Sequence, residues 1–318
     1  MEIGSFIELQ FPKGTEFYNS NQNIIRLNSG RSAIWHALRI LKCDTIWLPY
    51  YQCDSVRNFL TLKKANIKYY HVNDEFIPIN FNPKSNEAVL LVNYYGIMSE
   101  NRMCLLSQNY NNVIIDNSQA FFSKPIDNCM NIYSCRKFIG VPDGSYVIGK
   151  NAENIANYEQ GYSSETSSFL LERIEFGCEG KAYKSRMLNE QRIASEDIKL
   201  MSTLTRTILD GTDYSCIIKK RQMNFNIASE LFSDVNKIDP IYYYSKECVP
   251  MIYPLVIEDS NILHNLLVHK HFQGHWWDYL LDELPKDCFE YWLSKYIIPI
   301  TIDQRYGRKE IEYIRALI

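Results

Sequence analysis

The chain has 318 residues, enough for a large core and a second, smaller domain. Its 34 basic and 37 acidic residues give a formal net charge of −3, so broad binding to nucleic acid, which needs a basic face, is not expected. The nine cysteines are odd in number and include no Cys-x-x-Cys pair. This pattern is typical of reduced thiols and excludes a disulfide framework or a zinc site built on cysteines.

Neither a targeting segment nor a membrane span is expected from the sequence. Met1-Glu2-Ile3-Gly4 is not a basic region followed by a long apolar stretch. The most apolar run, residues 88–98, is too short to cross a bilayer and is interrupted by Asn93. We therefore expect a soluble, cytoplasmic protein without a membrane partner.

In the first half of the chain, short apolar runs alternate with helical stretches. Strands are predicted at residues 45–48, 67–72, 88–92 and 112–116, and helices at about 53–64 and 99–110. Near-continuous Val, Ile and Leu runs separated by helices are what a parallel sheet covered on both faces requires. The fold class is therefore α/β with right-handed crossovers. In such sheets functional groups gather at the carboxyl ends of strands, where Asp116 stands.

The second half has a different pattern. Residues 152–209 are helix-like without a clear strand, and a helix beginning near Asp213 opens what we expect to be a second unit. Its later elements are predicted as strands at 251–257 and 296–300 and a final helix at 308–317. The sequence thus predicts a large α/β domain over residues 1–210 and a small C-terminal α+β domain over residues 211–318.

One candidate binding segment is the small-residue turn Asn28-Ser29-Gly30-Arg31-Ser32-Ala33, which opens an amphipathic stretch. Unpaired N–H groups and the positive end of a helix dipole at such a turn suit a phosphate. An ordinary helix cap at Ser29 or Ser32 explains the same pattern.

A second candidate is Lys137, in the apolar segment Tyr133-Ser134-Cys135-Arg136-Lys137 before the turn Gly140-Val141-Pro142-Asp143-Gly144. Partial desolvation in a strand-like setting would favour an uncharged amine that can form an imine. The alternative is a lysine that extends into solvent.

Two further segments are ambiguous by themselves. Asp116 ends a predicted strand, where a carboxylate could also cap the next helix. The turn Leu48-Pro49-Tyr50-Tyr51-Gln52-Cys53 could supply a ring to cover a flat cofactor, although tyrosines also pack ordinary cores.

Together, in this order and spacing, these segments resemble the fold-type I aminotransferases, specifically the sugar aminotransferase family called DegT/DnrJ/EryC1/StrS. Ser-Gly-Thr-x-Ala, Pro-x-x-Thr-aromatic, His-x-Tyr-Gly, Asp-x-Ala-Gln and a lysine segment before an acidic glycine turn are the family's motifs. The matching segments here are Ser29-Gly30-Arg31-Ser32-Ala33, Pro49-Tyr50-Tyr51-Gln52-Cys53, Asn93-Tyr94-Tyr95-Gly96, Asp116-Asn117-Ser118-Gln119 and Ser134-Cys135-Arg136-Lys137. The resemblance extends over nearly the whole chain.

Three positions depart from the family pattern. Ile132 stands where a phosphate-binding serine is frequent, and Cys53 stands where a stacking Trp or Phe is common. The family's Asn-Tyr-Arg-Met segment is absent as such, and only Lys184-Ser185-Arg186-Met187 resembles it. Ser134 or Arg136 could take over the role of the missing serine.

The resemblance implies an aspartate aminotransferase-like fold with pyridoxal 5'-phosphate (PLP) as its cofactor. Lys137 would form the Schiff base and carry protons, and Asp116 would pair with the pyridinium nitrogen. The phosphate would be held by Gly30, Arg31, Ser32 and Ser134. Tyr51 or Cys53 would lie against the ring, and Gln119 beside its hydroxyl.

The implied reaction transfers an amino group from a donor such as glutamate to a keto sugar nucleotide, in surface polysaccharide or deoxyamino sugar synthesis. The enzyme would be a homodimer whose subunits complete each other's sites. Two alternatives stay open. One is a sugar dehydratase-like reaction on the same cofactor, against which Lys137 argues because histidine commonly replaces lysine in that branch. The other is a non-catalytic binding or regulatory protein, which Ile132 and Cys53 leave open.

Three other signals give weaker expectations. Arg305, just past a predicted strand, is a candidate for a substrate carboxylate or phosphate, with a local salt bridge as the alternative. His269, His271 and His275 lack a spaced Cys or carboxylate that would complete four ligands, so no metal is expected. Tyr242-Tyr243-Tyr244 predicts a half-buried strand, since the basic residues of a nucleic-acid stacking platform are sparse.

Overall fold

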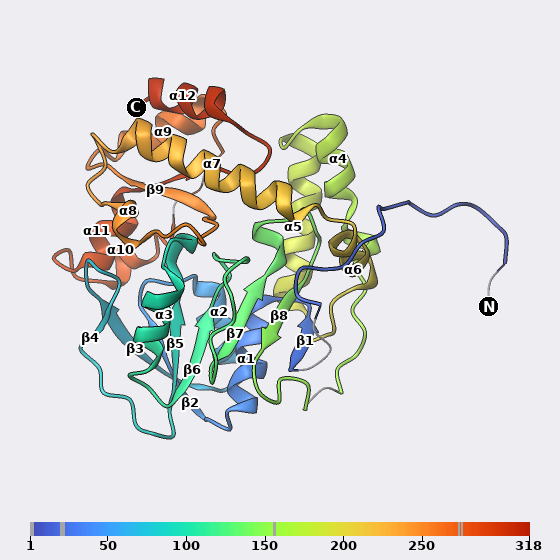
Figure 1. The fold of residues 1–318 in the computed structure, drawn as a ribbon, viewed down its shortest axis with the longest axis horizontal. Helices are drawn as coiled ribbons and strands as arrows, with labels where there is room; N and C mark the ends of the chain where they lie inside the picture. Colours follow the sequence, from blue (N-terminus) through green and yellow to red (C-terminus); the bar gives the residue numbers. More distant parts are fainter. Residues whose placement is uncertain (1–2, 20–22, 155–156, 273, 275) are drawn as a thin grey trace.

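An eight-stranded sheet crosses the part of the chain that the computed structural model describes, residues 3–19, 23–154, 157–272, 274 and 276–318 (Figure 1). The strand order is β1-β8-β7-β6-β5-β2-β3-β4. The strands are β1 (Ile24–Leu27), β2 (Thr45–Pro49), β3 (Asn66–Val72), β4 (Pro78–Ile79), β5 (Ala88–Val92), β6 (Asn112–Asp116), β7 (Met130–Ser134) and β8 (Ser145–Ile148). Neighbouring strands from β3 to β7 are parallel, whereas β8 runs antiparallel between β1 and β7.

The predicted strands and crossover helices of the first half are confirmed. They correspond to β2, β3, β5 and β6, and to α2 (Asp54–Leu62) and α3 (Glu100–Ser107). All five residues of β5 are buried, which explains its unbroken apolar sequence. Strands β1, β4, β7 and β8 were not predicted as strands.

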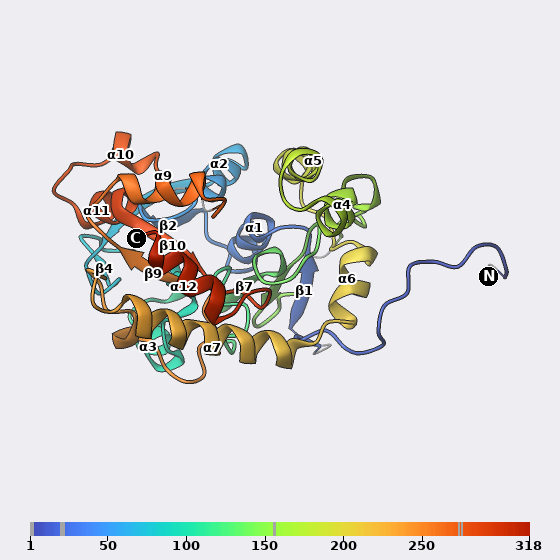
Figure 2. The ribbon, with the colours of Figure 1, turned by 90° about the horizontal axis from the view of Figure 1, so that it is seen from above.

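Helices cover both faces of the sheet. Figure 2 shows α1 (Gly30–Ile40) and α2 on one side and α3 and α7 (Tyr214–Phe232) on the other. Helix α1 begins at the Ser29 cap and buries Ala33, Ile34, Ala37 and Leu38, a stripe at helical spacing that packs against β6, β7 and β8.

The segment 152–209 contains helices, as predicted. These are α4 (Ser168–Phe176), α5 (Gly180–Ser195) and α6 (Thr203–Asp210), with a short 3-10 turn, η3 (Ser164–Thr166), before α4. Helices α4 and α5 form a hairpin, at the upper right in Figure 1.

Beyond residue 210, α7 is followed by a two-stranded antiparallel sheet, β9 (Ile252–Val256) and β10 (Ile297–Thr301), which confirms both predicted strands. The remaining helices are α8 (Pro240–Tyr243), α9 (Asn261–Val268), α10 (Leu280–Glu283), α11 (Phe289–Tyr296) and α12 (Arg308–Ala316). The final helix was predicted, and it packs on α7. No helix in the described part of the chain is long and apolar enough to cross a membrane.

The strand predicted at Tyr242-Tyr243-Tyr244 is wrong, because this segment belongs to α8 and the residue that ends it. Asp239 caps the helix by accepting a hydrogen bond from the N–H of Ile241, and Pro240 occupies the first helical turn. These start signals prevail over the β preference of an aromatic run. Tyr243 is buried, whereas Tyr242 is exposed.

Glu87 anchors the amino end of β5. Its carboxylate accepts hydrogen bonds from the Trp47 indole and the Lys68 ammonium, both at 2.6 Å, and from the N–H of Lys84 at 3.1 Å. The Lys68 bond, followed by the Trp47 bond, lowers the pKa of Glu87 to about 2. The ionised carboxylate is therefore favoured in the folded protein.

We predict that Glu87→Gln lowers the melting temperature at pH 7. The stabilisation due to the low pKa is complete above the ordinary value of 4.5 and is lost as the pH falls toward 2, so the difference from wild type should close over that interval. Thermal unfolding followed by circular dichroism between pH 2 and 7 measures this, with Glu153→Gln at an exposed position as control. A difference that does not change with pH would contradict the prediction.

Candidate functional site

The predicted site segments lie at one edge of the sheet, where the parallel strands end. Across this edge Asp116 on β6 pairs with Val92 on β5 and with Ile132 on β7, and Ser134 at the end of β7 pairs with Ser145. Ser145 in turn pairs with Leu27, directly before the glycine turn. The topology therefore brings the three chain regions of Gly30, Asp116 and Lys137 together, as expected for the carboxyl edge of such a sheet.

The turn before α1 contains the helix cap that the alternative interpretation required. The Ser29 hydroxyl accepts a hydrogen bond from the N–H of Ser32 at 3.3 Å and lies 2.8 Å from the Ser32 hydroxyl. Both serines are buried. A Cβ atom on Gly30 would lie 3.3 Å from the Ser118 hydroxyl, so the turn packs closely on the loop after β6.

The loop after β6 is tightly folded around Asp116. This carboxylate is buried and accepts a hydrogen bond from the N–H of Ser118 at 2.9 Å. The side-chain oxygen of Gln119 accepts from the N–H of Tyr95 at 2.8 Å, within the 3-10 turn η1 (Tyr94–Gly96). Asp116 and Gln119 thus belong to one ordered turn that contacts the end of β5.

Lys137 ends a second 3-10 turn, η2 (Cys135–Lys137), and its side chain is exposed. The N–H groups of Phe138 and Ile139 both donate to the Cys135 carbonyl, so the chain leaves β7 in a tight turn. The strand-like, partly desolvated setting predicted for this lysine is therefore wrong. In the described part of the chain, Lys137 forms no hydrogen bond or ion pair.

Arginine side chains gather beside this lysine. Burial lowers the pKa of Arg31 and the nearby Arg136 guanidinium lowers it further. Burial also lowers the pKa of Arg136, against the effect of Glu190, with which Arg136 forms an ion pair, while Arg186 adds to the lowering. Arg31, Arg136 and Arg186 thus outnumber the two carboxylates, Glu190 and Asp143, that act on Arg136, and the excess of positive charge suits a phosphate or another anion.

The two candidates for contact with a cofactor ring have different surroundings. Tyr51 has no exposed surface, because its hydroxyl lies 2.9 Å from that of Tyr95 and its ring packs edge-on against Trp277 at 4.5 Å. Cys53, at the cap of α2, is partly exposed and close enough to Arg31 to affect its pKa. This placement favours Cys53 over Tyr51 as the residue that faces the site.

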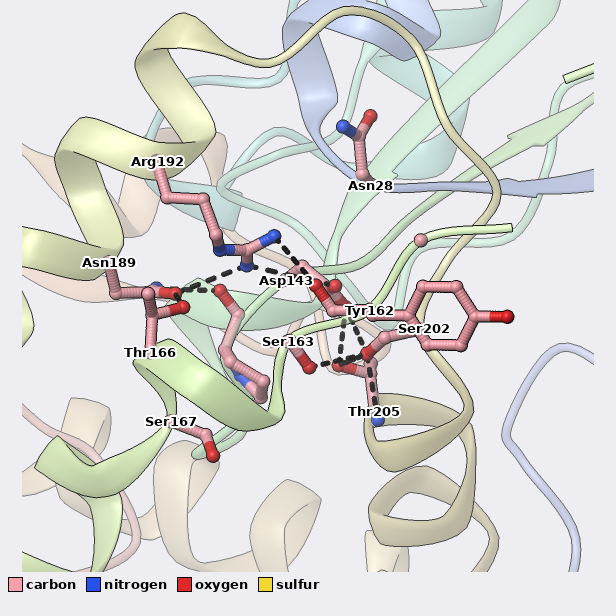
Figure 3. A network of polar contacts seen from close by, with 12 residues as sticks. Asn28, Asp143, Tyr162, Ser163, Thr166, Ser167, Asn189, Arg192, Ser202 and Thr205 are labelled. Atoms are coloured by element: carbon pink, nitrogen blue, oxygen red, sulfur yellow. Dashed lines mark hydrogen bonds and ion pairs between the residues drawn. The ribbon is translucent and has the colours of Figure 1, made fainter. Parts of the chain in front are cut away.

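A polar network anchors the loop between Lys137 and β8 (Figure 3). Its centre is Asp143, which is fully buried and accepts hydrogen bonds from the hydroxyls of Ser202 and Thr205, with the Arg192 guanidinium 3.9 Å away. Burial raises the pKa of Asp143, and the two hydroxyls and Arg192 oppose this effect. The side-chain amide of Asn189 donates to the Pro142 carbonyl at 2.8 Å.

The same loop is bonded to the glycine turn. The N–H of Gly144 donates to the Asn28 carbonyl at 2.9 Å, and the Ser145 hydroxyl donates to the Ser29 carbonyl at 2.8 Å. Ser145 and the partners of Asp143 were not identified from the sequence. The only signal was the pair Asp143-Gly144, which indicated an acidic turn but not its partners.

The remaining candidates do not join this cluster through any contact found in the described residues. Arg305 forms a two-pronged ion pair with Asp303 at 2.7 and 2.9 Å, which is the local salt bridge given as its alternative role. His269 is hydrogen-bonded to the carbonyl of Asn265, and His275 lies outside the described residues. In the part of the chain that is described, no three His, Cys, Asp or Glu side chains group to hold a metal.

No family model and no curated protein matches the sequence. Solved structures do. AtS13 from Actinomadura melliaura is similar with a TM-score of 0.63 and 13% identity, over 94% of this chain and 86% of that one. The sugar aminotransferase CalS13 from Micromonospora echinospora gives 0.62 and 10%, over 93% and 86%. The E. coli GDP-4-keto-6-deoxy-D-mannose-3-dehydratase with bound hydrated PLP gives 0.61 and 13%, over 92% and 87%.

The likeness to these structures extends over nearly the whole described chain. It shows that this protein has the fold they share, the PLP-dependent transferase fold, which confirms the predicted fold class. At 10–13% identity the likeness concerns the fold alone.

We predict that Gly96→Ala destabilises the protein by about 2–5 kcal/mol, combining positive-φ strain with overpacking. Gly96 has φ +74°, and an added Cβ would overlap with the Gln119 carbonyl oxygen. Gly180→Ala is the matched control, since Gly180 has φ +59° and open space around it, so only the strain of about 1–2 kcal/mol applies. Urea unfolding of both variants measures the difference, and equal losses would contradict the packing inferred around Gln119.

Proposed function

We propose that this chain is a PLP-dependent aminotransferase that transfers an amino group, with glutamate as donor, to the keto group of a nucleotide-linked sugar. The observation that carries the proposal is Lys137, exposed and without a partner in the described chain, at the same sheet edge as the buried carboxylate of Asp116. The similarity to a sugar aminotransferase and to a dehydratase holding PLP supports this choice. The enzyme would act in the cytoplasm, in surface polysaccharide or deoxyamino sugar synthesis.

The residues at this edge fit the cofactor. Gly30 packs so closely on Ser118 that an added Cβ would require the Ser118 hydroxyl to move by a few tenths of an ångström, as expected where backbone N–H groups approach a phosphate. Arg31 and Arg136 supply positive charge that Glu190 offsets only in part. The phosphate would be held by the N–H groups of Gly30 and Arg31, the guanidinium groups and the hydroxyls of Ser32 and Ser134, because the N–H of Ser32 already donates to Ser29. When bound, PLP supplies an electron-accepting ring that makes amino transfer possible.

The roles of the chain's own groups follow from their chemistry. The Asp116 carboxylate would hold the proton on the pyridine nitrogen, and its bond to the Ser118 N–H orients it for this task. Because the Gln119 side-chain oxygen accepts from Tyr95, its amide nitrogen is the group that would reach the ring hydroxyl. The Lys137 Nζ would bind the cofactor and, when released, move the proton of the donor's α-carbon. Cys53 would lie against the ring.

We propose further that the substrate cleft lies between a large domain, residues 1–210, and a small domain, residues 211–318. We also propose that the enzyme is a homodimer. The α4–α5 hairpin exposes large apolar side chains that a second copy would cover. They are Leu171, Ile174, Phe176, Tyr183, Met187 and Leu188. The same hairpin contributes Glu190 to the arginine cluster, so a partner bound there would lie beside the site.

The cofactor assignment predicts a yellow protein after addition of PLP. Borohydride should then attach the cofactor permanently to Lys137, as peptide mass spectrometry would detect, and glutamate should bleach the colour. Lys137→Ala should abolish the attachment, whereas Lys150→Ala, at an exposed lysine outside the site, should retain it. A colourless wild-type protein would overturn the proposal. A yellow protein that glutamate does not bleach would exclude glutamate as the amino donor and count against transamination.

The dimer proposal predicts that Leu188→Glu produces a monomer, because it buries a charge in the apolar contact. Light scattering coupled to gel filtration should give twice the chain mass of 37.4 kDa for wild type and the single mass for the variant. Leu105→Glu on α3 is the control, since Leu105 is 56% exposed and Leu188 is 60% exposed. A monomeric wild type, or equal behaviour of the two variants, would refute the proposed interface.

A further inference from the structure

Residues from the C-terminal part of the chain contact the turn that carries Lys137, and they do so at the next residue, Phe138. The side-chain amide of Gln304 donates a hydrogen bond to the Phe138 carbonyl at 2.9 Å. The Arg221 guanidinium lies over the Phe138 ring, with 4.5 Å between the Cζ atom and the ring centre. Backbone and side chain of the same residue are thus held from α7 and from the loop after β10.

Arg221 also fixes the orientation of Gln304. Its Nε donates to the side-chain oxygen of Gln304 at 3.1 Å, so the Gln304 nitrogen is the end that faces Phe138. The Nη1 of Arg221 donates to the Met251 carbonyl at 2.9 Å, and the N–H of Met251 donates to the Tyr95 carbonyl at 2.8 Å. Arg221 therefore contacts the turn after β7 at Phe138, and through Met251 it is connected to the turn after β5 at Tyr95.

The arginine at this position is not explained by packing alone. Arg221 is 2% exposed and forms no ion pair among the described residues, although Asp303, which pairs with Arg305, partly offsets its charge. Burial lowers its pKa to about 10, so it stays charged at neutral pH. A buried charge costs free energy unless hydrogen bonds compensate for lost hydration. An apolar side chain could fill the space without that cost, but it could not hold Met251, Gln304 and the Phe138 ring together.

We propose that Arg221 and Gln304 are positioning residues for Lys137, which act through Phe138 to fix the turn that presents the lysine amine. This inference rests on the proposed function, because positioning of the Lys137 amine matters only if this amine binds the cofactor. The pair makes the segment after residue 210 part of the lysine's support without any contact to the cofactor itself.

The test uses two substitutions of Gln304 and a matched control in the full-length protein. Gln304→Leu removes both of its hydrogen bonds. Gln304→Glu keeps an acceptor for Arg221, now as an ion pair, but has no N–H to donate to the Phe138 carbonyl. The control is Gln222→Leu, which removes a glutamine on α7 that donates to the carbonyls of Lys246 and Cys248, away from Phe138.

Two measurements are needed. Hydrogen exchange of the cofactor-free protein, followed by mass spectrometry, reports how firmly residues 136–141 are held. Titration with PLP and borohydride trapping reports the affinity of Lys137 for the cofactor. We expect both Gln304 variants to speed exchange in this segment and to weaken trapping at Lys137 by roughly fivefold, the typical effect of one lost hydrogen bond. Gln222→Leu should change neither, and trapping at Lys150 should be the same in all proteins.

Glutamate at position 304 separates positioning from stability. Its ion pair with Arg221 should keep the melting temperature above that of Gln304→Leu, while trapping at Lys137 is weakened equally. If hydrogen exchange in residues 136–141 is unchanged in both variants, Gln304 does not hold the turn after Lys137, and this conclusion is independent of cofactor binding. Faster exchange with unchanged trapping would overturn the positioning role. A wild-type protein that traps no PLP at Lys137 would instead overturn the proposed function, and the exchange data would still decide whether Gln304 holds the turn.

Discussion

The reversal of the chain between β7 and β8 is the constraint on which the candidate site depends. Because β8 runs antiparallel to its neighbours, residues 135–144 must turn back at the carboxyl edge of the sheet, where Asp116 also lies. Lys137 lies within this connection. The β8 end of this connection is tied to the turn before α1 and to the buried Asp143 network, and the N–H of Cys135 at the β7 end donates to the Gly144 carbonyl. The lysine, the carboxylate and the glycine turn therefore share one hydrogen-bonded frame.

The electrostatics of the site are linked to the same connection. Asp143 is buried at its far end and acts on both Arg136 and Arg192, while Glu190 pairs with Arg136 from the α4–α5 hairpin. These carboxylates allow guanidinium groups to stay partly buried beside Lys137. Because they do not balance all of the positive charge, an anion is favoured at this edge, and the strength of that preference depends on loops distant in the sequence.

The sequence predicted those parts of the fold in which a single physical signal dominates. Strands β5 and β6 are apolar runs, β2 and β3 are rich in β-branched and aromatic residues, and α12 shows an apolar stripe. Strand β7 was missed because Asn131 interrupts its apolar run. Its buried amide is tolerated only because it bonds to carbonyls of Ile126, Cys129 and Ile148, which a sequence does not show. The exposure of Lys137 and the burial of Tyr51 likewise depend on tertiary contacts.

The positions of Tyr51 and Cys53 bear on how a flat cofactor would be held. The Tyr51 ring cannot move toward the site without losing its contacts with Tyr95 and Trp277, and a thiol covers less of a ring face than an aromatic side chain does. Under the proposed function, the free energy that an aromatic ring would supply by stacking must come here from other contacts. Arg31 and Arg136 are suited to this, because charge-assisted bonds to a phosphate are among the strongest available to a protein. Phosphate recognition would therefore outweigh ring recognition in this chain, which is consistent with arginines gathering beside a cysteine.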